Sequence, residues 1–278
     1  MQTAVVTDST SDIPPELAHM YSIQIVPNVM IIEGQELEDG RGISRQEFYQ
    51  RLPDINPPPT TATSSSGTYS VLYQSLFDEG FSEIVSIHAS SVLSGIYNAA
   101  SAAAQMFGGR VRVIDSEQIS LGLGFQVLEI AERLTKGIQL ATILDQLPAF
   151  RERVHVVAML DTLEYVRRSG RVSWARAQLG ELLQIKPFLE VKNGSILRYG
   201  ETRTRQKGLE RLRRILHDFG PLERLAILHT NAEIEAREFL ASQEVDVQIQ
   251  PLIVNITTIV GVHVGPNALG IAAVRQMN

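Results

Sequence analysis

The chain has 278 residues, of which 44% are hydrophobic, and it contains no cysteine. This composition allows a core in one large domain or two ordinary ones, and it excludes disulfides, thiolate zinc sites and a cysteine nucleophile. The first residues lack the basic and apolar regions of a signal peptide, and no apolar run reaches the roughly 20 residues that span a bilayer. We therefore expect a soluble cytoplasmic protein.

Charge is distributed unevenly along the chain. The net charge of −6 argues weakly against nucleic-acid binding. Residues 1–150 carry a net charge of −10 and residues 151–278 one of +4. This asymmetry fits two domains with different roles, although surface variation without function explains it equally well. We predict domains at 1–150 and 151–278, with the boundary near Phe150.

Strands that alternate with amphipathic stretches predict an α/β fold. In the first half we expect extended segments at residues 4–7, 23–32, 84–88 and 111–114. Helices are predicted to end at Met20 and to span 44–52, 67–80, 95–107, 122–135 and 139–152. Ser44 and Glu47 have the spacing of a capping box. The prolines at 57–59 predict a stiff extended connector, and residues 60–66 a hydroxyl-rich loop.

In the second half we expect strands at residues 154–160, 187–191, 196–199, 225–229, 247–253 and 271–274. Asn193-Gly194 predicts a hairpin between the second and third of these strands. Helices are predicted on either side of residues 167–171 and over 203–219, 232–242 and 255–264.

Several catalytic motifs are absent from the sequence. There is no phosphate-binding loop and no Gly-x-Ser-x-Gly elbow. Gly122 and Gly124 follow a strand, but Val127 stands where a dinucleotide fingerprint needs its third glycine, so helix packing explains the pair better. The six histidines form no metal-ligand pair, and we predict no metal site. We also see no nucleophile with an adjacent base, which argues against an esterase.

Hydroxyl side chains gather after the predicted strands of the first half. Asp8-Ser9-Thr10, Ser90-Ser91 and Asp115-Ser116 each follow a strand. Any one of these residues is explained by helix capping. Residues 90–95 together with 60–66 favour an anion site, because parallel strand ends and helix N-termini would meet there. The helix after residue 95 is rich in alanine and serine, which permits either close packing or an apolar ligand.

Basic side chains mark the second half. Residues 203–214 predict a solvated helix face, with docking of an acidic partner as the alternative. Arg167-Arg168-Ser169-Gly170-Arg171 is compact enough to turn a guanidinium toward a carboxylate or phosphate. His263 lies at the end of an element, where a functional role and simple helix capping are equally well supported.

Four segments together resemble the DegV family, and their order matches over essentially the whole chain. They are residues 6–12 (VTDSTSD), 90–97 (SSVLSGIY), 168–171 (RSGR) and 263–266 (HVGP). The resemblance implies two α/β domains, the first with a parallel sheet between helices and the second with a mixed sheet. It also implies a long-chain fatty acid whose tail lies in the first domain, with the second domain closing over the head group.

The resemblance further implies the site residues. Thr61 and Ser91 should hydrogen-bond the carboxylate, Ser94 and Gly95 should shape the loop, and Arg171 and His263 should face the head group. Some family members present the fatty acid to a separate fatty acid kinase. The chain would then be a carrier with no catalytic residues and no cofactor, and its second domain would bear the docking surface.

One departure from the family pattern concerns the first loop. The family usually has Thr-Ser-Gln-Pro-Ser where this chain has Thr61-Ala62-Thr63-Ser64-Ser65, so the stiffening proline is missing. Two other functions stay open. One is a phosphotransferase or hydrolase that uses Ser91 or His263 on a small anionic substrate. The other is a lipid-responsive regulatory protein.

Overall fold

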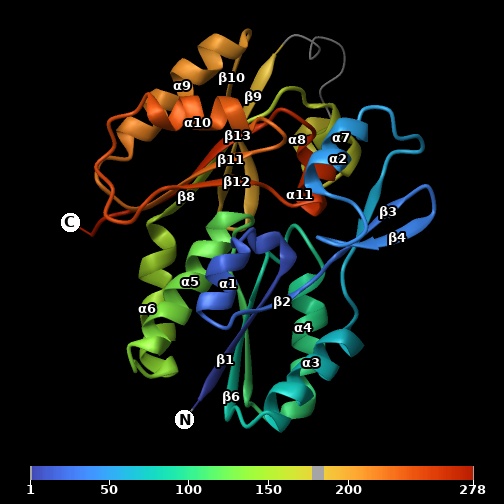
Figure 1. The fold of residues 1–278 in the computed structure, drawn as a ribbon, viewed down its shortest axis with the longest axis vertical. Coiled ribbons are helices and arrows are strands. Elements are labelled where there is room, and N and C mark those ends of the chain that lie inside the picture. The colour runs from blue at the N-terminus through green and yellow to red at the C-terminus, as the bar shows by residue number, and fades with distance from the viewer. Residues whose placement is uncertain (1, 177–184, 278) are drawn as a thin grey trace. The chain divides into compact units, whose positions relative to one another are not determined.

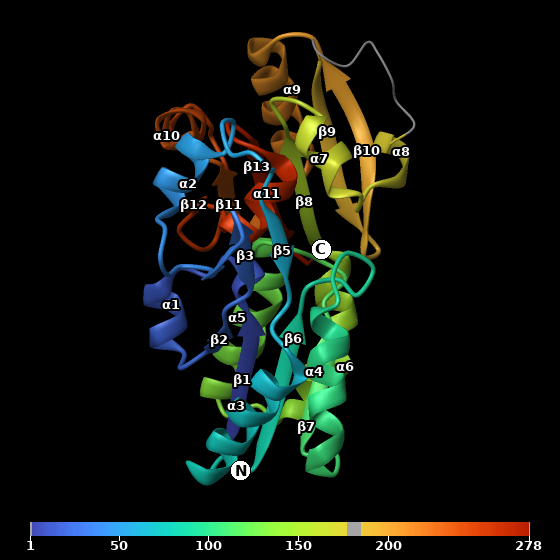
Figure 2. The same cartoon turned by 90° about the vertical axis from the view of Figure 1, so that its right-hand side faces the viewer.

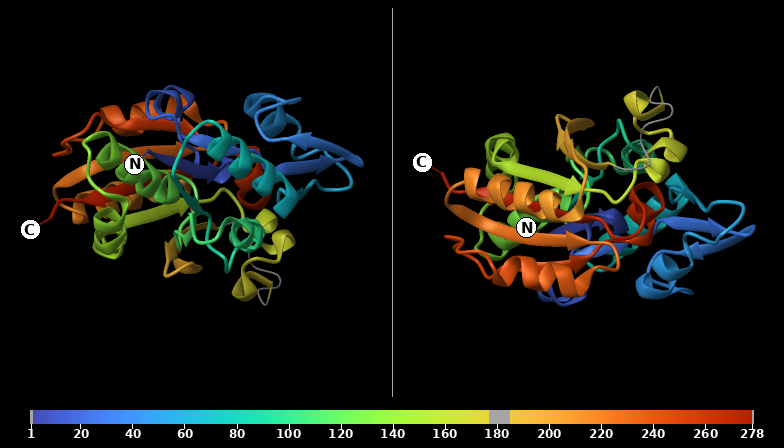
Figure 3. Two further views of the ribbon diagram at one scale, coloured as in Figure 1. Left: turned by 90° about the horizontal axis from the view of Figure 1, so that it is seen from below. Right: turned by 90° about the horizontal axis from the view of Figure 1, so that it is seen from above.

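A computed structural model of the chain describes residues 2–176 and 185–277. The chain folds into two compact units (Figures 1, 2 and 3). The first consists of Met1–Val29, Thr61–Glu152 and Asn193–Ser195, and the second of Met30–Thr60, Arg153–Lys192 and Ile196–Asn278.

The first unit contains a four-stranded parallel sheet in the order β2-β1-β6-β7. Its strands are β1 (Thr3–Asp8), β2 (Gln24–Val26), β6 (Glu83–His88) and β7 (Val111–Asp115). In β1 and β6 every residue after the first is buried, as expected for a sheet that is covered on both faces. The predicted parallel sheet between helices is confirmed.

Helices cover both faces of this sheet (Figure 1). On one side lie α3 (Ser66–Asp78) and α4 (Ile96–Ala104), and on the other α5 (Leu121–Thr135) and α6 (Leu140–Glu152). The remaining helical pieces are α1 (Pro15–Met20) and the 3₁₀ turns η1 (Ser9–Ser11) and η2 (Gln105–Phe107). In α5, a Cβ atom on Gly124 would lie 2.5 Å from the carbonyl oxygen of Ser11. The glycine therefore permits close packing, as the sequence suggested.

A six-stranded mixed sheet forms the centre of the second unit, in the order β10-β9-β8-β13-β11-β12. Its strands are β8 (Val154–Met159), β9 (Lys186–Lys192), β10 (Ser195–Thr202), β11 (Leu222–His229), β12 (Leu252–Asn255) and β13 (Leu269–Arg275). β11 and β12 are parallel, whereas β13 runs antiparallel to β8 and β11. Asn193 and Gly194 both have positive φ between β9 and β10, as the predicted hairpin turn requires.

The core of the second unit lies between this sheet and two helices. Leu212 and Leu216 of α9 (Arg205–Asp218) and Phe239 of α10 (Glu233–Ala241) pack with Ile227 and Ile271 of the sheet. The other helices of this unit are α2 (Arg45–Arg51), α7 (Glu164–Ser169), α8 (Ser173–Arg176) and α11 (Thr258–Val264). Among the described residues, no helix is long and apolar enough to cross a membrane.

Residues 30–60 group with the second unit, whereas the predicted boundary at residue 150 assigned them to the first domain. Long-range contacts explain the difference. The hydroxyl of Tyr49 in α2 donates to the carbonyls of Ile256 and Thr257, at 3.0 and 3.2 Å. A Cβ atom on Gly261 of α11 would lie 2.3 Å from the same hydroxyl, so only glycine allows this close packing.

Smaller differences concern element boundaries. The predicted loop at 60–66 begins with a strand, β5 (Thr60–Ala62), which joins β3 (Val29–Ile32) and the unpredicted β4 (Gln35–Glu38) in a three-stranded sheet. The strand predicted at 247–253 lies later, at β12, and the helix predicted at 255–264 begins at Thr258, capped by Thr257.

Candidate functional site

Three neighbouring strands of the first unit end in polar residues. β1 ends at Asp8, β6 at His88 and β7 at Asp115, and the register places His88 beside Asp115. Because these strands are parallel, the loops that follow them lie at one edge of the sheet, where α/β proteins usually bind their ligands. The three predicted hydroxyl clusters follow these three strand ends.

The loop after β6 is fixed by hydrogen bonds. Ser90 is buried, and its hydroxyl donates to a backbone carbonyl at 2.7 Å. The N–H of Ser91 donates to the carboxylate of Asp115 at 3.2 Å. The hydroxyl of Ser94 accepts a long hydrogen bond, 3.4 Å, from the N–H of Ile96 in the first turn of α4. Ser91 and Ser94 are half-buried.

The second hydroxyl-rich segment lies next to this loop. A Cβ atom on Gly95 would lie 3.9 Å from Oγ1 of Thr63, which places residues 60–66 beside the start of α4. Thr61 lies in β5 and is half-buried. Ser64 donates to the carbonyl of Pro27 at 2.5 Å, and Ser65 caps α3. These two serines hold the loop in which the family's proline is missing.

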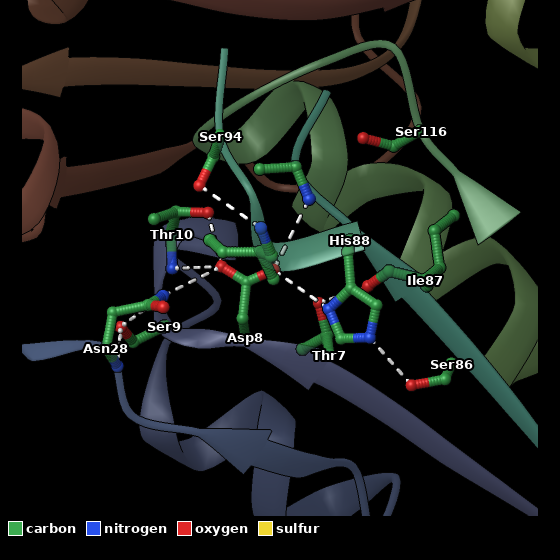
Figure 4. A network of polar contacts seen from close by, with 12 residues as sticks. Thr7, Asp8, Ser9, Thr10, Asn28, Ser86, Ile87, His88, Ser94 and Ser116 are labelled. Atoms are coloured by element: carbon green, nitrogen blue, oxygen red, sulfur yellow. Dashed lines mark hydrogen bonds and ion pairs between the residues drawn. The ribbon is translucent and has the colours of Figure 1, made fainter. Parts of the chain in front are cut away.

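A buried polar network includes the last residues of β1 and β6 (Figure 4). Nδ1 of His88 lies 3.0 Å from Asp8, and its Nε2 lies 2.7 Å from the hydroxyl of Ser86. That hydroxyl accepts a hydrogen bond from Tyr73 at 2.8 Å. An ionised Asp8 requires a proton on Nδ1, which makes Nε2 the acceptor for Ser86. Burial raises the pKa of Tyr73 to about 12, so its hydroxyl remains a donor at neutral pH.

The prediction that no nucleophile lies next to a base is wrong, because the hydroxyl of Ser86 lies next to the ring of His88. Ser86, His88 and Asp8 have the hydrogen-bond order of a serine hydrolase triad. All three are fully buried, however, and Tyr73 donates to the serine oxygen, so a substrate has no route to it. We therefore assign this network a structural role. The spacing of Ser86 and His88 on one face of a strand was the available sequence signal.

The two predicted site residues of the second unit interact electrostatically. His263 lies in α11 and is half-buried. Burial lowers the pKa of His263 to about 4, and the positive charge of Arg171 adds to the effect. His263 is therefore neutral at physiological pH. Arg171 is exposed beyond α7, where Gly170 ends the helix in a left-handed conformation, and its guanidinium donates to the carbonyl of Ser169 at 2.7 Å.

Three residues of the first unit support the predicted hydroxyl segments but were not named as fatty-acid-binding residues, although Ser90 and Thr63 lie within the segments 90–95 and 60–66 that predicted a site. Asp115 fixes the backbone of Ser91, Ser90 anchors the same loop, and Thr63 lies beside Gly95. Their strand-end and loop positions were visible in the sequence, but their partners were not. Across residues 2–176 and 185–277, no three histidine, aspartate or glutamate side chains lie close enough together to hold a metal ion.

The fold and the strand-end hydroxyls define a two-unit α/β protein with a polar edge on its parallel sheet. Residues 2–276 match the family described as "uncharacterised protein, DegV family", and the chain belongs to this family. A DegV domain-containing protein of Deinococcus radiodurans is 35% identical over 277 residues, which cover 98% of both chains.

Two solved structures have folds similar to that of this chain. A DegV family protein from Thermus thermophilus, described by its fatty acid binding, has a TM-score of 0.91 and 30% identity, and covers 99% of this chain and 100% of its own. DegV from Bacillus subtilis, described as a fatty acid binding protein, has a TM-score of 0.86 and 31% identity with the same coverage.

Proposed function

We propose that this protein binds a long-chain fatty acid and holds its carboxylate with hydroxyl groups of the first unit. The observation that carries the proposal is the set of half-buried residues Thr61, Ser91 and Ser94. Ser91 and Ser94 lie in the loop before α4, and Thr61 lies in β5, two residues before Thr63, which approaches Gly95 at the start of α4. Helix N-termini leave N–H groups unpaired and favour anions. The fatty acid binding described for the Thermus and Bacillus relatives supports the same ligand class.

This choice of side chains is physically reasonable for a fatty acid. Neutral hydroxyls can orient a carboxylate without the desolvation cost of a buried ion pair. The acyl chain contributes about 0.8 kcal/mol for each buried CH₂ group, so the tail supplies most of the affinity. The hydroxyls then fix where the carboxylate lies.

We propose further that the protein is a cytoplasmic carrier that presents the carboxylate to a separate fatty acid kinase. Arg171 and His263 would act at the head group or in kinase docking. An exposed guanidinium such as that of Arg171 can bind a phosphoryl group or an acidic partner in bidentate geometry. A neutral His263 can donate or accept one hydrogen bond without adding charge.

Native mass spectrometry of the purified protein, with solvent extraction of the bound material, tests the ligand. We expect a stoichiometric fatty acid, and its identity gives the chain length and saturation. A protein that is free of lipid and takes up no added fatty acid contradicts the proposal and favours the enzyme acting on a small anionic substrate.

Substitutions test the two roles separately. Ser91→Ala should weaken fatty acid binding in a folded protein, whereas Ser75→Ala, on the exposed side of α3, should not. Arg171→Ala should retain the lipid but slow phosphorylation by the kinase. The exposed Arg41, changed to alanine, is its control. Unchanged affinity in Ser91→Ala removes that residue from the site, and normal turnover of Arg171→Ala refutes its role.

A further inference from the structure

The second unit contains a polar cavity that none of the predicted site residues lines. Its volume is about 740 Å³, within the range of roughly 300–1,000 Å³ that is usual for small-molecule sites. It lies at the carboxyl ends of three strands that run in one direction: Asp161 follows β8, His229 ends β11 and Asn255 ends β12. This is the edge of an α/β sheet where ligands commonly bind.

The wall of the cavity is held by hydrogen bonds. The N–H of Asn231 donates to the side-chain oxygen of Asn255 at 3.1 Å, and the N–H of Ala232 donates to Nδ1 of His229 at 3.2 Å. The N–H of Asn267 donates to the carbonyl of the residue that follows β11, at 2.8 Å. The loops that carry the lining side chains are therefore fixed before any ligand arrives.

His229 provides a hydrogen-bond donor at the cavity. The residue is only 3% exposed, yet it lines the space. Its Nδ1 accepts a backbone N–H, and burial lowers the pKa of the ring, so the neutral ring carries its proton on Nε2. Within the described part of the chain, this Nε2–H has no hydrogen-bond partner. This nitrogen is not among the buried unpaired atoms of the described residues, so a water molecule or a ligand in the cavity can accept its proton.

Side-chain amides supply the remaining hydrogen-bonding capacity. Asn231 and Asn255 are half-buried in the wall, and Gln46 and Asn267 are exposed at the rim. Apart from the oxygen of Asn255, these amide groups bond to no other group in the residues that the structure describes. Each amide offers a donor and an acceptor, so together they match a ligand whose groups both donate and accept.

Charge argues against an ionic ligand. Of the four carboxylates that line the cavity, Glu233, Glu235 and Asp161 are already engaged by Arg237, Arg205 and Lys186, respectively. The fourth, Glu238, is exposed to solvent, which screens its charge. Two of these carboxylates stand in the first turn of α10, where they oppose the binding of an anion. Among the described residues, no phenylalanine, tyrosine or tryptophan ring and only two apolar side chains line the space, so it suits neither a nucleobase nor a lipid.

We propose that this cavity is a binding site for an uncharged, hydroxyl-rich small molecule, a sugar or polyol. Hydroxyl groups donate and accept at once, as the free amides and the His229 donor require. The site is separate from the residues proposed for the fatty acid, so either proposal can fail without the other.

Two positions allow a clean test. Asn231 and Asn267 have φ of 55° and 60°, where glycine is free of strain, so Asn→Gly removes the amide and keeps the backbone. Asn193, with φ of 48° in the β9–β10 turn, is a matched control outside the cavity. Unchanged thermal unfolding and unchanged extracted fatty acid would show that each variant is otherwise intact.

The probes are D-glucose, D-ribose and myo-inositol, titrated into the purified protein and followed by NMR of the histidine ring and side-chain amides. Concentrations should reach about 50 mM, roughly fifty times a millimolar dissociation constant. We expect at least one probe to shift the His229 signal, with binding on the order of tenfold weaker in Asn231→Gly and Asn267→Gly and unchanged in Asn193→Gly.

Other outcomes overturn the proposal. No response to any of the three probes shows that the cavity binds no sugar or polyol. Tighter binding of glucose 6-phosphate than of glucose shows an anion site, and a response to adenosine alone shows a nucleobase site. An equal loss of binding in Asn193→Gly shows that the response does not arise from the cavity.

Discussion

Replacing Asp8 by asparagine tests the buried network of the first unit most directly. The carboxylate accepts five hydrogen bonds: from the N–H and hydroxyl of Thr10, from Asn28, from His88 and from the N–H of Ala89. Asparagine keeps one acceptor oxygen. Its NH₂ group takes the place of the second oxygen and faces the donors that bonded to that oxygen. His88 can change tautomer in response, but the N–H of the fully buried Ala89 would lose its acceptor.

The magnitude follows from these losses. An unsatisfied buried donor costs about 1–3 kcal/mol, and hydrogen bonds to a neutral amide are weaker than those to a carboxylate. We expect Asp8→Asn to lower the free energy of unfolding by about 2–4 kcal/mol. Urea unfolding at pH 7, followed by far-ultraviolet circular dichroism, measures this. The control is Asp78→Asn, at an exposed position on α3, which should change the stability by less than about 0.5 kcal/mol.

The effect of Asp8→Asn should depend on pH. Burial alone raises the pKa of Asp8, but the hydrogen bonds from His88 and Thr10 outweigh it and hold this pKa below its ordinary value of 3.8. A carboxyl group with a lowered folded-state pKa adds stability above its unfolded pKa and loses it as the pH falls through the folded value. The stability difference from the parent should therefore be complete above about pH 5 and shrink below about pH 4. A variant as stable as Asp78→Asn at pH 7 would refute the reasoning.

Three further predictions concern single groups. Tyr73→Phe removes the donor to the network's serine and should cost about 0.5–1.5 kcal/mol in urea unfolding; no loss would mean that this hydrogen bond is not stabilising. Gly261→Ala should lower the free energy of unfolding by about 1–3 kcal/mol, because its methyl group overlaps Tyr49, and by less in a protein that already carries Tyr49→Leu. If the two substitutions have additive effects, the contact between these residues is contradicted. The ring of His263 should titrate near pH 4 by NMR, and Arg171→Ala should raise that pKa because a neighbouring positive charge is removed. A lower pKa of His263 in Arg171→Ala would contradict the electrostatic interaction between the two residues.

The sequence predicted the elements of the fold well where local signals were strong. The buried strands β1, β6 and β7 and the capped helix α2 lie where their patterns indicated. Only part of the strand predicted at 247–253 forms: Val247 makes an isolated parallel bridge with Leu222 of β11, and the regular strand β12 begins at Leu252. Pro251 has no N–H to donate, and β12 pairs with β11 only from Leu252 onward.

Local sequence patterns did not predict the contacts between residues that are far apart in the chain. Nothing local joins Tyr49 to Ile256, and this long-range hydrogen bond is part of what places residues 30–60 in the second unit. The candidate site shows the same limit. The alternation of strands and helices predicted that hydroxyl side chains follow the strand ends. The bond from Ser91 to Asp115 and the approach of Thr63 to Gly95 depend on the folded loops.

The position of residues 30–60 has a consequence for how the protein is made. Phe48 and Tyr49 are buried in the finished protein, and Tyr49 hydrogen-bonds residues near position 256. During synthesis these aromatic rings leave the ribosome about two hundred residues before their partners exist. A nascent or truncated chain that stops before α11 therefore leaves Tyr49 without these partners. Such fragments should attract chaperones and proteases until α11, in the last tenth of the sequence, has been translated.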